Sequence, residues 1–233
     1  MDHIGLYASL VGLGLLPSAV WLVFFLKRDC HPEPKSVVAR TFLMGMLVAP
    51  IALLVQLALK KFGPTAEIQT FFFLASFAEE CVKLYAVKVI ALNNAAFDEP
   101  VDAMIYMIAA ALGFAAVENM LILLQVIPDG INIAIGVLSL RFIGATLLHA
   151  LSSGLLGYFL AMSWFHEHHR KKLVIFGLIY ASLFHAMFNV LISTFTGQLR
   201  ALGYATALLV FMAFLVSILF DKVRDRGIPK IEN

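Results

Sequence analysis

The sequence contains few charged residues for its length. Asp, Glu, Lys and Arg together make up 14% of its 233 residues, whereas 61% are hydrophobic. Because charged residues usually form about a quarter of a soluble domain, this composition excludes a chain built mainly of soluble domains. Together with a mean hydropathy of +0.91, it predicts a polytopic membrane protein. We therefore expect one integral membrane domain over residues 1–233.

Cysteine and extended basic surfaces are also lacking. The two cysteines, Cys30 and Cys81, are too few for a disulfide framework and too far apart for a zinc knuckle. The formal net charge is only +2, and the basic residues form short clusters beside apolar segments. We therefore expect no nucleic-acid binding. The N-terminal residues lack the positive region of a cleaved signal peptide, so we expect residues 4–26 to form a retained helix.

Long apolar runs are abundant. They predict seven transmembrane helices, at about residues 4–26, 41–60, 68–92, 102–126, 134–162, 173–196 and 201–220. Helices are required because lipid cannot satisfy backbone polar groups, and the alternating pattern of a barrel is missing. The expected fold is an all-α bundle of about seven helices that passes repeatedly through the cell membrane.

Basic residues are distributed unevenly between the connections. Eleven lie within residues 27–40, 170–172 and 222–230, on one predicted side of the bilayer, and four lie near the other side. Basic residues collect on the cytoplasmic side of membrane proteins. This distribution predicts an extracytoplasmic N-terminus and a cytoplasmic C-terminus.

The third predicted span carries charges in its middle. Glu79, Glu80 and Lys83 lie in a segment that is otherwise apolar except for Lys88. Ionisable residues inside a membrane cost free energy and usually mark a functional site. The plainer interpretation is a self-neutralising triplet that only locks helix packing.

Three later spans each supply one more polar group. Glu118, His149 and His185 lie about 18 to 24 Å from the predicted cytoplasmic ends of their helices, as does Glu80. A lone histidine in a span is more often an interhelical hydrogen-bond donor than a ligand. Packing roles alone do not require four groups at one depth, however, so we expect a common buried site between the third and sixth spans.

Two histidines with several carboxylates are suited to hydrolysis. A carboxylate base activates water, with or without a metal held by two histidines and a glutamate. The same groups would also suit a proton or cation relay in a transporter, although the sequence has no internal repeat. The residues by themselves leave these chemistries open.

The motifs resemble those of the PrsW family of intramembrane proteases, part of a wider clan with CAAX prenyl endopeptidases and bacteriocin-processing membrane proteases. The resemblance covers about half of the chain, within residues 68–196. It is carried by Glu79-Glu80-x-x-Lys83, Glu99-Pro100-x-Asp102, Phe114-x-x-x-Glu118-Asn119, His149 and His185-x-x-x-Asn189.

The resemblance implies cleavage of a membrane-anchored protein substrate, with site-1 cleavage of an anti-sigma factor as the bacterial theme. It implies a general base within the pair Glu79 and Glu80, with Glu79 favoured. The other implied roles are metal ligands, with zinc expected, at Glu118, His149 and His185, an oxyanion-stabilising or His185-orienting group at Asn189, and electrostatic partners at Lys83 and Asn119. A metal-free glutamate mechanism and a non-catalytic scaffold are the alternatives within this clan.

Overall fold

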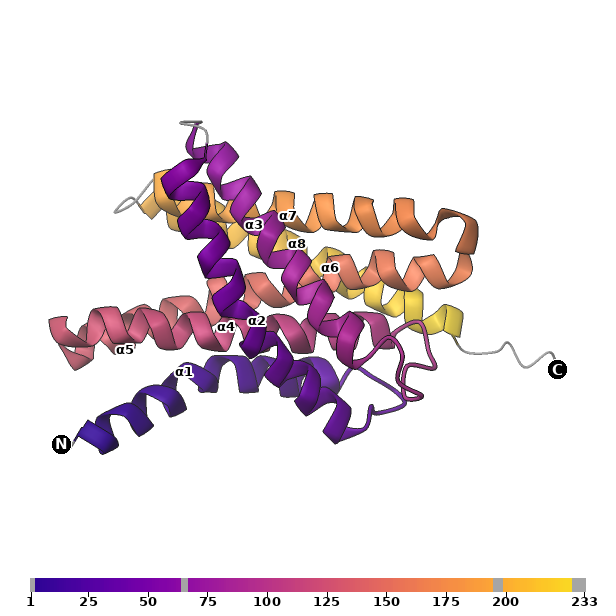
Figure 1. Cartoon of the computed structure of the whole chain (residues 1–233), viewed down its shortest axis with the longest axis horizontal. Helices are drawn as coiled ribbons and strands as arrows, with labels where there is room; N and C mark the ends of the chain where they lie inside the picture. The colour runs from indigo at the N-terminus through magenta and orange to yellow at the C-terminus, as the bar shows by residue number, and fades with distance from the viewer. Residues whose placement is uncertain (1–2, 64–66, 195–198, 228–233) are drawn as a thin grey trace.

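The computed structural model describes residues 3–63, 67–194 and 199–227, and within them the chain is helical with no β-strand (Figure 1). The α-helices of this part are α1 (His3–Leu26), α2 (Lys35–Phe62), α3 (Ile68–Ile90), α4 (Asp102–Val126), α5 (Ile131–Ile143), α6 (Ala145–Phe165), α7 (Arg170–Thr194) and α8 (Leu199–Gly227). Short 3₁₀-helices lie at Ile127–Asp129 and Glu167–His169. The all-α fold class is confirmed.

Five segments in the described part of the chain are long and apolar enough to cross a membrane. They are Lys35–Phe62, Asp102–Asp129, Ile131–Phe165, Arg170–Thr194 and Leu199–Arg226. The apolar stretch Gly12–Leu26 of α1 is shorter, and charged residues interrupt the apolar sequence of the continuous helix α3. The result is a multi-pass membrane protein. The predicted end of the sixth span, residue 196, lies outside the described residues.

The predicted span over residues 134–162 lies within the apolar segment Ile131–Phe165, but this segment is not one continuous helix. The segment bends at Gly144, whose φ and ψ are −87° and −95°, so that α5 and α6 are separate helices. A Cβ atom on this residue would lie 2.7 Å from the Leu140 carbonyl oxygen, so a larger residue would clash there. The apolar run contains no charge or proline at this point, and hydropathy therefore gave no sign of the break.

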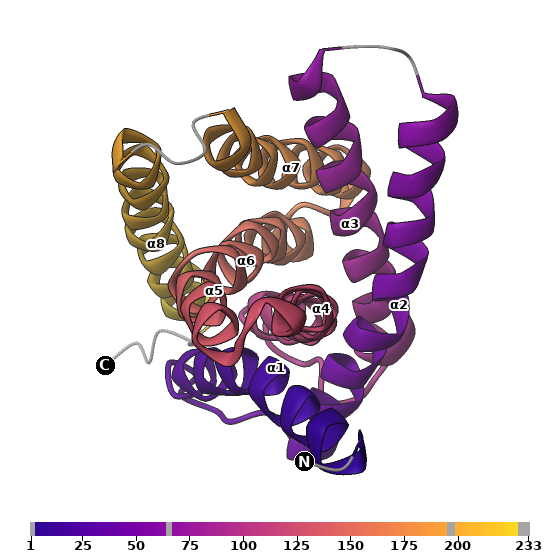
Figure 2. The same ribbon diagram turned by 90° about the vertical axis from the view of Figure 1, so that its left-hand side faces the viewer.

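Helix α4 occupies the centre of the bundle (Figure 2). It packs against α1, α2 and α6, and every residue from Asp102 to Ala116 is buried. Alanine and glycine dominate its middle, and small residues let neighbouring helices approach closely in membranes. The charged groups of α3 therefore face a rigid central helix.

Helices α2 and α4 cross at two glycines. A Cβ atom on Gly113 would lie 1.9 Å from the Phe42 carbonyl oxygen, and one on Gly45 would lie 2.0 Å from the Ala110 carbonyl oxygen. Contacts this short are impossible, so any side chain at either position would push the two backbones apart.

Gly113→Ala is therefore expected to destabilise the protein by about 1 to 3 kcal/mol, the usual cost of overpacking a core. The measurement is thermal unfolding in detergent. Gly136→Ala is the matched control, because a Cβ atom there meets nothing within 4 Å and alanine favours the helix by about 1 kcal/mol. Equal melting temperatures for the two variants would contradict the close crossing.

Polar contacts join two connections at one end of the bundle. His31 Nδ1 lies 2.8 Å from Glu99 Oε1, and the Tyr106 hydroxyl donates a hydrogen bond to Glu33. Asp102 accepts hydrogen bonds from the backbone N–H groups of Asp98 and Glu99. These contacts tie the connection before α2 to the start of α4.

Candidate active site

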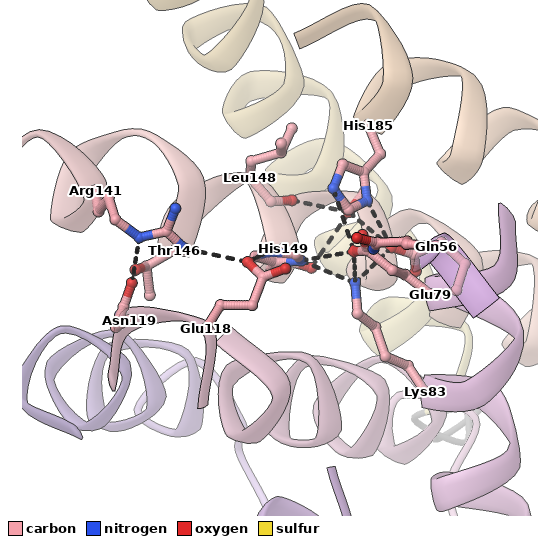
Figure 3. Close-up of polar contacts among 12 residues, drawn as sticks. Gln56, Glu79, Lys83, Glu118, Asn119, Arg141, Thr146, Leu148, His149 and His185 are labelled. Atoms are coloured by element: carbon pink, nitrogen blue, oxygen red, sulfur yellow. Dashed lines mark hydrogen bonds and ion pairs between the residues drawn. The ribbon is translucent and has the colours of Figure 1, made fainter. Parts of the chain in front are cut away.

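Four helices bring the predicted polar residues together. Glu79 and Glu80 on α3 meet His185 on α7 and His149 on α6, and Glu118 on α4 contacts His149 from the other side (Figure 3). Glu79, Glu80, His149 and His185 are each at most 4% exposed. These groups, which the sequence predicted to share one buried site, lie together between α3, α4, α6 and α7.

Both carboxylate oxygens of Glu80 accept hydrogen bonds. Its Oε1 accepts hydrogen bonds from Lys83 Nζ at 2.8 Å and Ser152 Oγ at 3.2 Å, and its Oε2 accepts one from Ser153 Oγ at 2.6 Å. His185 Nδ1 lies 3.2 Å from the same Oε1. Buried charges are stable when paired and hydrogen-bonded in this way. Glu80 thus serves as an anchor for the groups around it.

Glu79 differs from Glu80 in having one oxygen that accepts no hydrogen bond. Its Oε1 accepts a hydrogen bond from Gln56 Nε2 at 2.7 Å, whereas its buried Oε2 has no hydrogen-bond partner among the described residues. That Oε2 lies 3.5 Å from His185 Nε2, 3.7 Å from Lys83 Nζ and 3.9 Å from His149 Nδ1. A buried carboxylate oxygen that accepts no hydrogen bond is costly, and this one faces both histidines.

Hydrogen-bond partners assign the tautomers of both histidines. An ionised carboxylate only accepts hydrogen bonds, so His149 carries its proton on Nε2, which lies 2.9 Å from Glu118 Oε2. For His185 we assign the proton to Nδ1, because this nitrogen lies 3.2 Å from Glu80 Oε1, whereas Nε2 lies 3.5 Å from Glu79 Oε2. The remaining nitrogens, Nδ1 of His149 and Nε2 of His185, present lone pairs toward Glu79 Oε2. Three acceptor atoms therefore converge on one position.

Such a set of acceptors fits a metal cation. The ligand atoms of Glu79, His149 and His185 all lie within 4.8 Å of one another, and histidine nitrogens with a carboxylate oxygen are typical zinc ligands. The neighbourhood holds three carboxylates (Glu79, Glu80, Glu118) and two cations (Lys83, Arg141), which leaves one net negative charge with neutral histidines. Lys83 Nζ, however, lies 2.8 Å from His149 Nδ1, so an ammonium already faces one of the three lone pairs.

The predicted ligand set differs from this group in one member. Glu118 is not part of the converging three; it is 29% exposed and lies against His149 Nε2 and Arg141. Asn119 donates hydrogen bonds to Thr146 Oγ1 and to the Gly14 carbonyl, which joins α4 to α6 and α1. Asn189 is half-buried one helical turn after His185 on α7.

Two site residues were missed in the sequence. Gln56, which holds Glu79, was visible as an isolated amide in an apolar run. Arg141, which binds Glu118 and Asn119, was counted only as a charge near the end of a span. Both also line a groove of about 260 Å³ between α2 and α4.

The groove lies beside the buried cluster, because Gln56 and Glu118 in its wall contact Glu79 and His149. Glu118, which contacts His149, lies in its wall, and its apolar lining includes Leu53, Leu121 and Ile122. Leu53 is 40% exposed, so the groove opens laterally, where lipid would surround the protein.

Comparison with known proteins agrees with this geometry. The family model for PrsW family intramembrane metalloproteases matches residues 33–219. Curated proteins named Protease PrsW are similar over most of their length. The one from Geobacillus kaustophilus is 31% identical over 189 residues, covering 79% of this chain and 80% of the relative. The one from Bacillus subtilis is 27% identical over 210 residues, covering 89% and 90%.

No solved structure matches the chain significantly. The family match covers most of the chain, and it includes all the helices that form the buried cluster of glutamates and histidines. This chain therefore belongs to the PrsW family of intramembrane proteases.

Proposed function

We propose that this protease hydrolyses a peptide bond in a membrane-anchored protein at the centre formed by Glu79, His149 and His185. The observation that carries the proposal is the convergence of three acceptor atoms on one buried position. Nothing in a helix-packing role calls for a carboxylate oxygen to be held there without a donor, since each unpaired buried group costs about 1 to 3 kcal/mol. A water molecule that loses a proton to one of these atoms would become a nucleophile.

The contacts suggest a division of roles between the two adjacent glutamates. Glu79 Oε2 is free to accept a proton from water, whereas both oxygens of Glu80 are already occupied. In this proposal Glu79 is the general base or a ligand of the activated water, and Glu80 orients Lys83 and His185. Asn189, one turn after His185, would stabilise the oxyanion that forms on the substrate carbonyl.

We further propose that Glu79, His149 and His185 hold zinc, with Glu118 supporting His149 from behind. When bound, zinc would supply hydroxide from water at neutral pH and polarise the scissile carbonyl. The second candidate is a metal-free mechanism with Glu79 as the base. It is favoured by the contact between Lys83 Nζ and His149 Nδ1, because the ammonium occupies the lone pair that a metal would need.

Metal analysis separates these two mechanisms. If zinc is required, the purified protein contains about one zinc ion per chain, a chelator removes both metal and cleavage activity, and added Zn²⁺ restores them. His185→Gln should then lose the metal while remaining folded. Full activity in protein that elemental analysis shows to be free of metal would instead support the metal-free mechanism.

The lateral groove is the proposed route for the substrate. Leu53→Trp would fill it, and we expect KM for a membrane-anchored reporter to rise by about tenfold, or 1.4 kcal/mol. Leu54→Trp is the matched control, because the neighbouring Leu54 is 66% exposed and faces away from the groove. A similar KM for both variants would show that the substrate enters elsewhere.

The uneven distribution of basic residues supports an orientation with the N-terminus outside and the C-terminus in the cytoplasm. In that orientation the groove opens in the outer half of the bilayer. We propose single-span proteins with an extracytoplasmic domain as substrates, with anti-sigma factors as the first class to test. Mapping new N-termini in membranes that contain the wild-type protein or Glu79→Gln would identify them. If the wild type produces no additional termini, the proposed function is wrong.

A further inference from the structure

One charged side chain lies beside the catalytic cluster without belonging to it. Arg141 is on α5, just before the bend at Gly144, and its side chain is only 19% exposed. Its Nη2 donates a hydrogen bond to Glu118 Oε2 at 3.1 Å, and its Nε donates one to Asn119 Oδ1 at 2.7 Å (Figure 3). A guanidinium presents its donors in a rigid fork, so Arg141 fixes two adjacent residues of α4 at once.

The contact continues from Glu118 to the imidazole. The Glu118 Oε2 atom that Arg141 binds is also the one that lies 2.9 Å from His149 Nε2. This hydrogen bond keeps the His149 proton on Nε2 and leaves Nδ1 directed toward Glu79 and Lys83. Partners that hold the outer nitrogen of an active-site histidine determine its tautomer and ring orientation.

Glu118 needs a contact that holds its side chain in place. Its side chain is 29% exposed and lines the lateral groove, so without Arg141 it would be free to turn away from His149. Asn119 anchors the arginine in turn, because its Nδ2 donates to Thr146 on α6 and to the Gly14 carbonyl on α1. Through Asn119, Arg141 is therefore linked to helices on both sides of α4, namely α6 and α1.

We propose that Arg141 is a positioning residue that holds Glu118, and through it the reactive tautomer of His149. The bend at Gly144 separates α5, which carries Arg141, from α6, which carries His149. This inference rests on the proposed function for its kinetic test, but the state of the imidazole is measurable without any substrate.

Because Arg141 also lines the groove, the alternative is that it binds the substrate directly. The two roles affect different kinetic constants. A residue that only positions His149 changes kcat and leaves KM unchanged, whereas a substrate-binding arginine changes KM.

The test compares Arg141→Gln, Arg141→Lys and Arg28→Gln with the wild-type protein in proteoliposomes containing a membrane-anchored reporter. Arg28 is the matched control: it is 26% exposed, donates to Ser217 at 2.8 Å and lies 3.4 Å from Asp221, away from the site. We expect Arg141→Gln to lower kcat about 10- to 100-fold with KM unchanged. Arg141→Lys should recover part of the rate, and Arg28→Gln should match the wild type.

A double-mutant cycle tests whether the arginine acts through Glu118. In a Glu118→Gln background, Arg141→Gln should lower kcat little further, because the residue that it positions is already lost. Independent losses that multiply, or a change confined to KM, would overturn the proposal.

The second readout is the imidazole itself. In protein labelled with nitrogen-15 histidine, the His149 signals are assigned by their loss in His149→Gln. The wild type should show a protonated Nε2, and Arg141→Gln should show a mixture of tautomers, with Arg28→Gln unchanged. Identical spectra for the wild type and Arg141→Gln would overturn the inference. If the spectra change as expected but the wild type cleaves no reporter, the proposed function fails and the positioning role stands.

Discussion

Glu79→Gln is expected to lower the rate of substrate cleavage about 100- to 10,000-fold, the range typical of losing a general base. The amide has nearly the same shape as the carboxylate and still accepts a hydrogen bond from Gln56, which Glu79 Oε1 accepts at 2.7 Å. What it lacks is the anionic oxygen, without a hydrogen bond, that faces His149 and His185. The measurement is cleavage of a membrane-anchored reporter in proteoliposomes at equal amounts of folded protein.

Two comparisons make this result specific. Glu67→Gln changes an exposed carboxylate immediately before α3 and should cleave at the wild-type rate. The melting temperature of Glu79→Gln should stay close to that of the wild type, because the substitution removes a buried charge rather than adding one. If Glu79→Gln cleaves as fast as Glu67→Gln, Glu79 is neither the base nor an essential ligand.

Lys83→Met is expected to cost about 3 to 5 kcal/mol of stability, the usual effect of leaving a buried charge without its partner. The ammonium is completely buried, lies 2.8 Å from Glu80 Oε1 and 3.7 Å from Glu79 Oε2, and sits 4.7 Å from the centre of the Phe114 ring. Methionine retains most of the volume but none of the charge. Thermal unfolding in detergent and the yield of folded protein measure the loss.

Lys88→Met provides the control for this change, since Lys88 is exposed on the same helix and its loss should alter stability by less than about 0.5 kcal/mol. Adding Glu80→Gln to Lys83→Met should recover part of the stability, because the unpaired anion is then gone. Equal stability of Lys83→Met and Lys88→Met would mean that the ammonium does not neutralise the buried glutamates.

The two predictions distinguish a residue of α3 that should act in the reaction, Glu79, from one that should stabilise the fold, Lys83. Glu79 has an oxygen without a donor, and its loss should mainly affect the reaction. Glu80 is saturated by Lys83, Ser152 and Ser153, and a change to this network should mainly affect stability. In the sequence, Glu79 was favoured over Glu80 only through a resemblance, whereas the contacts supply a physical reason for the preference.

Much of the architecture was determined by the sequence itself. Apolar runs long enough to span a bilayer predicted the helices, and most predicted spans agree with the helices in the structure. Glu79, Glu80, Glu118, His149 and His185 were identifiable as members of one site because lipid makes isolated polar groups costly. Each of these predictions uses local information, namely hydropathy and depth along one helix.

The bend between α5 and α6 and the contacts within the site depend on the tertiary structure. Hydropathy does not record the backbone bend at Gly144, and it does not show that Arg141 reaches back to Glu118 across that bend. The choice of Glu79 as the carboxylate that joins the two histidines also depends on contacts between helices. Hydrogen bonds are directional and extend only about 3 Å, so which donor meets which acceptor is settled when helices distant in the sequence pack together.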